Sequence, residues 1–99
     1  MNFATIKFST GVLLATPGAL KALEKAGQTA EFFLSRHELG DWGEVCDEDQ
    51  RLNDLALITG ERLLSAYRTL RNQRIWVLTD AADDDGQREA TTVLLPEEY

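Results

Sequence analysis

Cysteine and histidine are almost absent from this sequence, which has one of each, Cys46 and His37, among 99 residues. A single cysteine excludes an intramolecular disulfide and fits a reducing cytosol. A zinc site needs three or four ligands, usually with a second cysteine or histidine, so any metal site here would depend on carboxylates. The sequence also lacks a glycine-rich phosphate loop, a G-x-S-x-G motif and a C-x-x-C motif. We therefore expect no metal centre and no cofactor.

Long apolar runs are absent too. No stretch approaches the roughly 18 apolar residues that a membrane span needs. Residues 1–16 lack a basic start that leads into a long apolar run, which is the pattern of a signal peptide. We therefore expect a cytoplasmic protein that neither crosses a membrane nor carries a signal peptide.

Basic residues are few: the chain has 10 Lys and Arg against 17 Asp and Glu, for a net charge of −7. A protein that grips nucleic acid by its phosphates needs a basic face, so direct nucleic-acid binding is not expected. An acidic surface can instead compete with nucleic acid for a basic partner. Solubility alone is the other explanation of such a surface.

The residues that are present are those of one globular domain, spanning 1–99, with 43% hydrophobic and 27% charged residues. Apolar periodicity predicts the order β-α-β-α-β-β-β, which indicates an α+β domain with a single antiparallel-rich sheet and two helices. The expected elements are an extended segment Thr5–Ala15, a helix Pro17–Ala26, a strand Thr29–His37, a helix from Asp47 to Gly60, and strands Arg62–Thr69, Arg74–Thr79 and Ala90–Leu95.

Two helix starts carry local signals. Thr16 can cap the first helix, and Pro17 suits its first position, where a missing N–H costs nothing. In the second helix, Asp47 and Gln50 have the spacing of a capping box. The apolar stripe that packs this second helix onto the domain is expected to consist of Leu52, Leu55, Ala56 and Thr59.

The stretch from His37 to Asp49 gathers the unusual residues, with the only histidine, the only cysteine and six acids. It reads as a loop that runs into a helix N-terminus, and loops often carry function. We expect His37 and Asp41 to hydrogen-bond this loop and Trp42 to plug it onto the sheet. The alternative is a small hydrolase or metal-dependent enzyme, in which His37 is the base for Cys46 and Asp41 takes part.

A second acidic segment, Asp80 to Glu89, is predicted to be a hairpin tip that bends near Gly86. If Gly86 is aligned with the glycine of a calcium-binding EF-hand loop, Ala81 occupies the first ligand position and Thr92 the position that requires a bidentate glutamate. Both flanks are predicted strands rather than helices. We therefore expect a solvated tip and no calcium site.

Several motifs together carry a family resemblance. They are Ala15-Thr16-Pro17-Gly18-Ala19, His37-x-x-Gly40-Asp41-Trp42-Gly43, Asp49 with Asn53, Arg62-Leu63-Leu64-Ser65-Ala66-Tyr67, Ile75-Trp76, and Thr91-Thr92-Val93-Leu94-Leu95-Pro96-Glu97-Glu98-Tyr99. With these motifs the chain resembles, over nearly its whole length, a family of short proteins carried by bacterial plasmids, phages and other mobile elements. It departs from the family at the acidic insert from Asp83 to Arg88, where relatives have a tight turn.

Some members of that family are described as plasmid-related proteins, others as modification subunits of type I restriction enzymes. A methyltransferase needs a nucleoside-binding α/β domain and an Asn-Pro-Pro-type loop, and this chain has neither. The resemblance implies an accessory protein of a mobile element. Small acidic proteins in that setting are often inhibitors of restriction enzymes or of CRISPR effectors.

The leading hypothesis is therefore a non-enzymatic protein that inhibits a bacterial defence complex, either a CRISPR effector or a restriction enzyme, by occupying a basic surface. Its expected contact residues are Glu44, Asp47, Glu48, Asp49, Asp80, Asp83, Asp84 and Asp85. Besides the enzyme described above, the alternative is a homodimeric plasmid-maintenance or regulatory module, paired through an exposed edge at Thr5–Ala15 or Ala90–Leu95.

Overall fold

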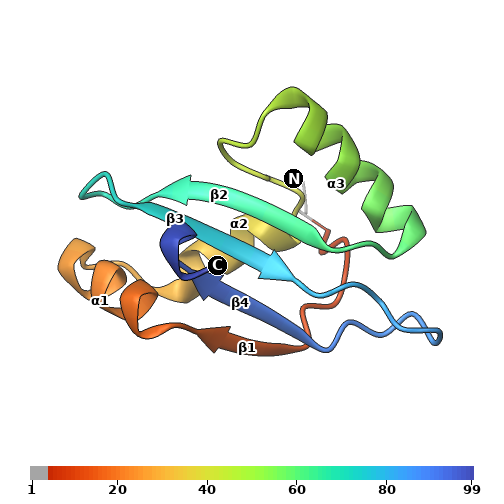
Figure 1. Cartoon of the computed structure of the whole chain (residues 1–99), viewed down its shortest axis with the longest axis horizontal. Helices are drawn as coiled ribbons and strands as arrows, with labels where there is room; N and C mark the ends of the chain where they lie inside the picture. Colours follow the sequence, from red (N-terminus) through yellow and green to blue (C-terminus); the bar gives the residue numbers. More distant parts are fainter. Residues whose placement is uncertain (1–4) are drawn as a thin grey trace.

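The computed structural model describes residues 5–99 and contains one four-stranded sheet and three α-helices (Figure 1). This confirms the predicted α+β class. No helix within the described residues is long and apolar enough to cross a membrane. The elements are β1 (Val12–Ala15), α1 (Pro17–Ala26), α2 (Ala30–Glu38), α3 (Asp47–Thr59), β2 (Leu63–Arg68), β3 (Arg74–Thr79), β4 (Ala90–Leu94) and the 3₁₀-helix η1 (Pro96–Glu98).

The sheet is mixed, with the strand order β1-β4-β3-β2. β2, β3 and β4 form an antiparallel meander, whereas β1 runs parallel to β4, with Val12 opposite Ala90. The predicted antiparallel-rich sheet is wrong in this respect. Three helices separate β1 from the meander, and a crossover of that length allows a parallel pair, which a hairpin does not.

The predicted strand Thr29–His37 is wrong, because this segment is the helix α2. The observed order is therefore β-α-α-α-β-β-β, with one helix more than expected. Thr29 caps α2, since its Oγ1 accepts a hydrogen bond from Phe32 N at 3.3 Å. The apolar run Phe32-Phe33-Leu34 resembles a strand centre, but only Phe33 and His37, which are four residues apart on one helix face, are buried.

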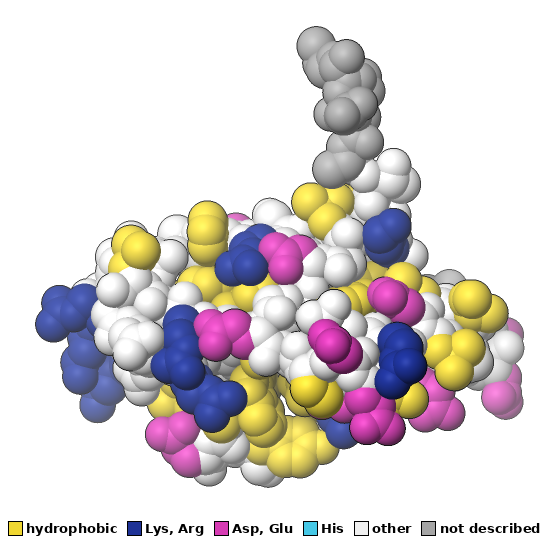
Figure 2. Space-filling model, turned by 90° about the horizontal axis from the view of Figure 1, so that it is seen from above, with side chains coloured by type: hydrophobic (Ala, Val, Ile, Leu, Met, Phe, Trp, Pro, Cys, Tyr) yellow, Lys and Arg dark blue, Asp and Glu magenta, His cyan; other side chains and the backbone are white. Residues whose placement is uncertain are grey.

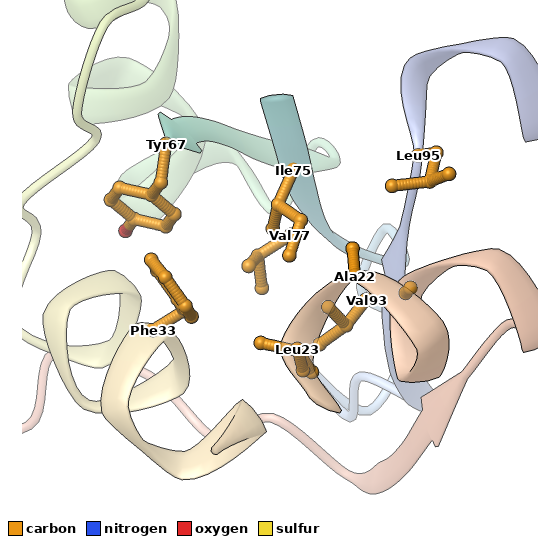
Figure 3. Close-up of a cluster of buried hydrophobic side chains, with 9 residues drawn as sticks. Ala22, Leu23, Phe33, Tyr67, Ile75, Val77, Val93 and Leu95 are labelled. Carbon is orange, nitrogen blue, oxygen red and sulfur yellow. The ribbon is translucent and has the colours of Figure 1, made fainter. Parts of the chain in front are cut away.

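The hydrophobic core lies between α1, α2 and one face of the sheet (Figure 3). α1 begins as predicted: Thr16 Oγ1 accepts from Ala19 N at 3.2 Å, and Pro17 follows. The ring of Phe33 from α2 lies 5.5 Å from that of Tyr67 from β2. The buried members of this core are Ala19, Ala22, Leu23, Phe33, Tyr67, Ile75, Val77, Val93 and Leu95.

The start of α3 differs from the predicted capping box. Cys46 is the N-cap, without a side-chain hydrogen bond, and Asp47 is the first helical residue. Gln50 reaches back to Val45 O at 3.3 Å instead of serving a box with Asp47. Asp47, Glu48 and Asp49 all lie in the first turn, where carboxylates interact favourably with the helix dipole. The end of α3 at Gly60, in the left-handed conformation, is as predicted.

Glu98, in η1, ties the last turn of the chain to the beginning of α1. One carboxylate oxygen accepts from Thr16 Oγ1 at 2.5 Å and from Leu95 N at 2.9 Å, and the other accepts from Gly18 N at 3.1 Å. These hydrogen bonds lower the pKa of Glu98, with the one from Thr16 contributing most. A Cβ atom at position 18 would lie only 2.7 Å from the carboxylate, so glycine allows this close approach.

Candidate functional site

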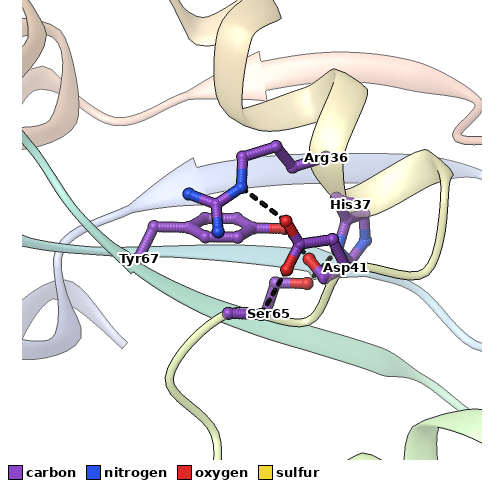
Figure 4. Close-up of polar contacts among 6 residues, drawn as sticks. Arg36, His37, Asp41, Ser65 and Tyr67 are labelled. Atoms are coloured by element: carbon purple, nitrogen blue, oxygen red, sulfur yellow. Dashed lines mark hydrogen bonds and ion pairs between the residues drawn. The ribbon is translucent and has the colours of Figure 1, made fainter.

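His37 lies inside the domain rather than in an open site. Its side chain is 0% exposed, and both ring nitrogens have partners: Nδ1 lies 2.5 Å from Ser65 Oγ and Nε2 lies 2.8 Å from Thr79 Oγ1 (Figure 4 shows His37 above Ser65). Thr79 Oγ1 in turn lies 2.7 Å from Thr91 Oγ1, which donates to Thr10 O at 2.8 Å. This buried chain of hydrogen bonds joins α2 to three strands.

The directions of these hydrogen bonds follow from the carbonyl at one end. Thr91 donates its only hydroxyl proton to Thr10 O. Thr79 therefore donates its hydroxyl proton to Thr91 and accepts a hydrogen bond from His37. His37 is therefore the neutral tautomer with its proton on Nε2, and Ser65 donates to Nδ1. Burial, and to a smaller extent the nearby Arg88 cation, lowers the pKa of His37 to about 4.

Asp41 organises the loop after α2. Its carboxylate pairs with Arg36 at 2.7 Å and accepts from Gly43 N at 3.2 Å, and both contacts lower its pKa, that with Arg36 the more (Figure 4). The Arg36 guanidinium lies 4.5 Å from the centre of the Tyr67 ring. Tyr67 donates its hydroxyl proton to Asp41 O at 2.5 Å. The carboxylate of Asp41 is therefore bound by the Arg36 side chain and by the backbone N–H of Gly43.

Trp42 is buried, and its ring lies against those of Phe8 and His37. Its Nε1 donates to Asp54 Oδ1 on α3 at 2.9 Å. Cys46 is exposed, whereas His37 is sealed from solvent and has no free ring nitrogen. A base must reach the proton that it removes, so His37 is not placed to act as the base for Cys46. Among residues 5–99, no group of three His, Cys, Asp or Glu side chains could hold a metal ion.

The burial of His37 makes the stability of the domain depend on pH. Because its folded pKa of about 4 lies below the unfolded value near 6.5, the unfolded chain binds a proton that the folded chain does not bind. The free energy of unfolding should therefore fall by about 2 kcal/mol between pH 7 and pH 5. Urea unfolding at both pH values measures this change.

The control for this pH effect is His37→Gln, whose side chain does not titrate. Its stability, although lower, should be nearly constant between pH 7 and pH 5. Asp41 and Glu98 also have lowered pKa values, but their contributions are lost only at more acidic pH. An equal fall in both proteins would contradict the assignment to His37.

α3 does not pack through the leucine stripe that its periodicity predicts. Asn53 and Ala56 are its buried residues, and Asn53 hydrogen-bonds the backbone of Leu64, accepting from its N at 3.2 Å and donating to its O at 2.8 Å. The predicted packing of Leu52, Leu55 and Thr59 is wrong, while Ala56 is buried as expected. Leu52 is 56% exposed, Leu55 54% and the neighbouring Ile58 84%.

A groove of about 310 Å³ runs along α3 beside β2. Leu52 and Leu55 of α3 line it together with Leu64 of β2, and so do two carboxylates, Asp49 in the first turn of α3 and Glu61 just beyond its end. The complete lining is Val45, Asp49, Leu52, Asn53, Leu55, Thr59, Glu61, Arg62 and Leu64. The exposed leucines and this groove form one surface, which we call the α3 groove.

The eight acids expected to form one contact surface lie in two groups at opposite ends of α3. Glu44, Asp47, Glu48 and Asp49 surround its first turn, and the hairpin that holds Asp80, Asp83, Asp84 and Asp85 reaches its last turn, where Ala82 N donates to Gly60 O at 2.7 Å. A helix of 13 residues spans roughly 20 Å, which separates the two groups.

Two of these acids have structural partners. Glu44 pairs with Arg68 at 3.0 Å. Asp83 shapes the hairpin tip, because its Oδ1 accepts from Asp85 N and from Gln87 N, both at 2.9 Å. Gly86 adopts a positive φ of 79° at the bend. The remaining acids are exposed and free to meet a partner.

Arg88 anchors this hairpin to α3. It is buried, and its guanidinium donates to Ala56 O, Glu61 O and Asp80 O at 2.7 to 3.0 Å. The carbonyl of Ala56 belongs to the last turns of α3, where a cation also interacts favourably with the helix dipole. Arg88 therefore fixes the position of the acidic tip beside the last turn of α3, where Asp83 and Asp84 line a second pocket rather than the α3 groove.

The surface is uneven in charge (Figure 2). Arg68, Arg71 and Arg74 are exposed around the β2–β3 turn, and basic side chains gather at that end of the view. Acidic side chains are more frequent toward the other end, with hydrophobic side chains between them. The chain therefore presents an acidic and apolar surface beside α3 and a basic one at the opposite tip.

Comparison with known proteins adds no family to this description. No protein-family model matches the chain, and neither the curated proteins nor the solved structures include a significant match.

The leucines of the α3 groove are the candidate site residues that the sequence-based hypothesis missed, since it assigned them to the core. One signal could have identified them. α3 carries two stripes at helical spacing, Asn53 with Ala56 and Leu52 with Leu55, and a helix lying against the edge of a two-layer domain buries only one. Asn53 is a polar residue in a buried stripe, and it holds α3 to β2 through its hydrogen bonds to the backbone of Leu64.

Proposed function

We propose that this chain is a protein-binding domain that takes an apolar segment with basic flanks from a partner protein into the α3 groove. The exposure of Leu52 and Leu55 beside Leu64 supports this proposal most directly. Exposed leucines that line a groove favour protein contact, because covering the half of each side chain that is still exposed gives about 0.8–1.5 kcal/mol.

The charges around the groove favour a partner with basic flanks. Asp49, in the first turn of α3 with Asp47 and Glu48, lines one part of the groove, and Glu61, just beyond the end of α3, lines another. Asp84 lies outside the groove, in a pocket beside the last turn of α3. Carboxylates in these positions steer a basic partner and place its flanks, while the leucines hold its apolar centre. The contribution of the carboxylates should weaken as salt increases.

The resemblance to mobile-element proteins directs the search for this partner. We propose that the partner is a host defence complex, a CRISPR effector or a restriction enzyme, and that the chain inhibits it in the cytoplasm by covering a basic surface that otherwise binds nucleic acid. The acidic composition of the chain fits that role, because an acidic surface can compete with nucleic acid for a basic surface of the partner.

The test is affinity capture from nuclease-treated lysates of defence-carrying bacteria, followed by mass spectrometry. The wild type should retain a nuclease or CRISPR complex. Replacing Leu52 and Leu55 with glutamine should weaken the interaction at least tenfold when the affinity for the purified complex is measured. Glutamine is a good helix former, so α3 should remain folded, which far-UV circular dichroism checks.

The matched control is Leu70→Gln, at an exposed leucine in the β2–β3 turn far from the groove. It should retain the wild-type affinity. A second variant, Asp84→Lys with Asp85→Lys, tests the acidic tip and leaves Asp83 in place, because Asp83 shapes the turn. Equal affinity of the Leu52/Leu55 variant and the Leu70 control would contradict binding in the groove.

A further inference from the structure

The two edges of the sheet differ in their free hydrogen-bonding groups. On the β2 edge, Asn53 occupies the N–H and C=O of Leu64. Two residues further on, Ala66 N donates to Trp42 O at 3.0 Å, and Glu44 N donates to Ala66 O at 2.7 Å. The chain itself therefore fills the hydrogen-bonding positions of this edge between Leu64 and Ala66, and no further strand can add there.

The β1 edge is open. Val12 N donates to Glu89 O and Thr16 N donates to Val93 O, so the alternate residues of β1 face β4. The N–H and C=O groups of Leu13 and Ala15 therefore point away from the sheet. No helix or strand in residues 5–99 lies beyond β1, which forms the lower rim of the sheet in Figure 1. The expected edge at Ala90–Leu95 is wrong, because β4 lies between β1 and β3.

We propose that β1 pairs with β1 of a second copy of the chain, antiparallel, around a two-fold axis at Leu14. In this register Leu13 lies opposite Ala15 of the second copy, and Ala15 opposite its Leu13. Each of these pairs exchanges two backbone hydrogen bonds, so four form across the axis. The two sheets then become one continuous sheet of twice the width.

The neighbouring residues exclude the other symmetric registers. An axis at Ala15 would place Leu13 opposite Pro17, which has no N–H to donate. An axis at Leu13 would place Ala15 opposite Gly11, whose φ of 64° is outside the strand conformation. The Leu14 axis is the register in which every outward group of β1 has a partner in extended conformation.

Charge favours a second copy as the occupant of this edge. A net charge of −7 makes two copies repel each other, yet no charged residue occurs from Phe8 to Leu20. Edge strands that avoid pairing are often very short or carry lysine, proline or a bulge; β1 is short, with four residues, but has no lysine, proline or bulge within Val12–Ala15. The antiparallel contact is also self-complementary, because both copies supply the same donors and acceptors.

Pairing would also cover apolar side chains on the helix-free face of the sheet. Val12 is 62% exposed and Leu14 50% exposed. In the proposed register, Leu14 meets Leu14 of the second copy in the closer type of cross-strand pair. β1 and the α3 groove lie at opposite edges of the sheet, so dimerisation leaves the groove open and is independent of the proposed function.

Sedimentation equilibrium on the purified full chain tests the dimer. The wild type should have the mass of a dimer, and Leu14→Lys should be a monomer with an unchanged circular dichroism spectrum, because it places two like charges at the axis. The matched control is Leu52→Lys on α3, which adds the same charge at a similarly exposed leucine and should remain a dimer. A monomeric wild type at about 1 mM, or a dimeric Leu14→Lys, would overturn the proposal.

Disulfide trapping tests the register. In a Cys46→Ser background, Leu14→Cys should cross-link two copies under mild oxidation, because residues opposite each other in this type of pair have Cβ atoms close enough for a disulfide. Val12→Cys, on the same face, should not, since it lies opposite Thr16 of the second copy. Cross-linking through Val12 instead of Leu14 would overturn the Leu14 axis.

Discussion

Replacing His37 with alanine should lower the free energy of unfolding by about 4 kcal/mol, a large part of the stability of a domain of this size. The loss has two sources. The substitution leaves a cavity in a fully buried position, and it removes the partner of both Ser65 and Thr79. Urea unfolding followed by tryptophan fluorescence measures the change. An enzymatic role would instead predict lost function at an unchanged melting temperature.

Two further variants isolate the cause of this loss. Thr79→Val keeps the volume but leaves the Nε2–H of His37 without an acceptor, so it should cost about 1–3 kcal/mol. The double variant, His37→Ala with Thr79→Val, should lose less free energy of unfolding than the sum of the two single losses, since both residues belong to one hydrogen-bonded chain. Phe32→Ala, on the same helix but half exposed, is the control and should cost about 1 kcal/mol or less. A His37→Ala variant as stable as this control would contradict the structural role.

Replacing Gly43 with alanine should destabilise the domain by more than about 3 kcal/mol. A Cβ atom at this position would lie 2.0 Å from Ala66 O, at the point where the loop pairs with β2. The φ of +74° is also unfavourable for alanine. The expected result is a separation of the loop from β2, detected as a lower urea midpoint and faster hydrogen exchange of the Glu44 amide.

Gly86 supplies the matched control for this effect. Its φ is +79°, close to that of Gly43, but no atom lies within 4 Å of the position that a Cβ would take. Gly86→Ala should therefore show the backbone cost alone, about 1–2 kcal/mol. The difference between the two variants measures the close approach of the loop to β2. If Gly43→Ala and Gly86→Ala lost the same free energy of unfolding, the close approach of Gly43 to Ala66 O would not contribute to the loss.

The parts of the fold that were predictable from the sequence are those with local signals. Thr16 and Pro17 begin α1, and Gly60 ends α3, through interactions that involve only residues within a turn of each other. The strands β2, β3 and β4 show apolar alternation and are joined by short or hairpin connections, with Asn72 adopting the positive φ that the β2–β3 turn needs. Local sequence therefore determines the meander and two helices.

The parts that could not be predicted depend on distant partners. α2 was missed because an apolar triplet suits a strand as well as a helix, and its buried residues Phe33 and His37 are recognisable only once the sheet beneath them is known. In the candidate site, the acids are evident from composition. The exposure of Leu52 and Leu55 is not, because it follows from the hydrogen bonds between Asn53 and the backbone of a different element.

The hydrogen bonds between Glu98 and the start of α1 influence the order in which the domain folds. Thr16 and Glu98 are 82 residues apart, and the parallel pair β1–β4 is nearly as distant in sequence, whereas Thr79 and Thr91 in the meander are 12 apart. Closing a short loop costs less chain entropy than closing a long one, so the meander should form early and β1 should dock late. During synthesis, β1 leaves the ribosome before the other three strands but can pair only after β4 has followed, so the proposed dimer edge is completed late in folding.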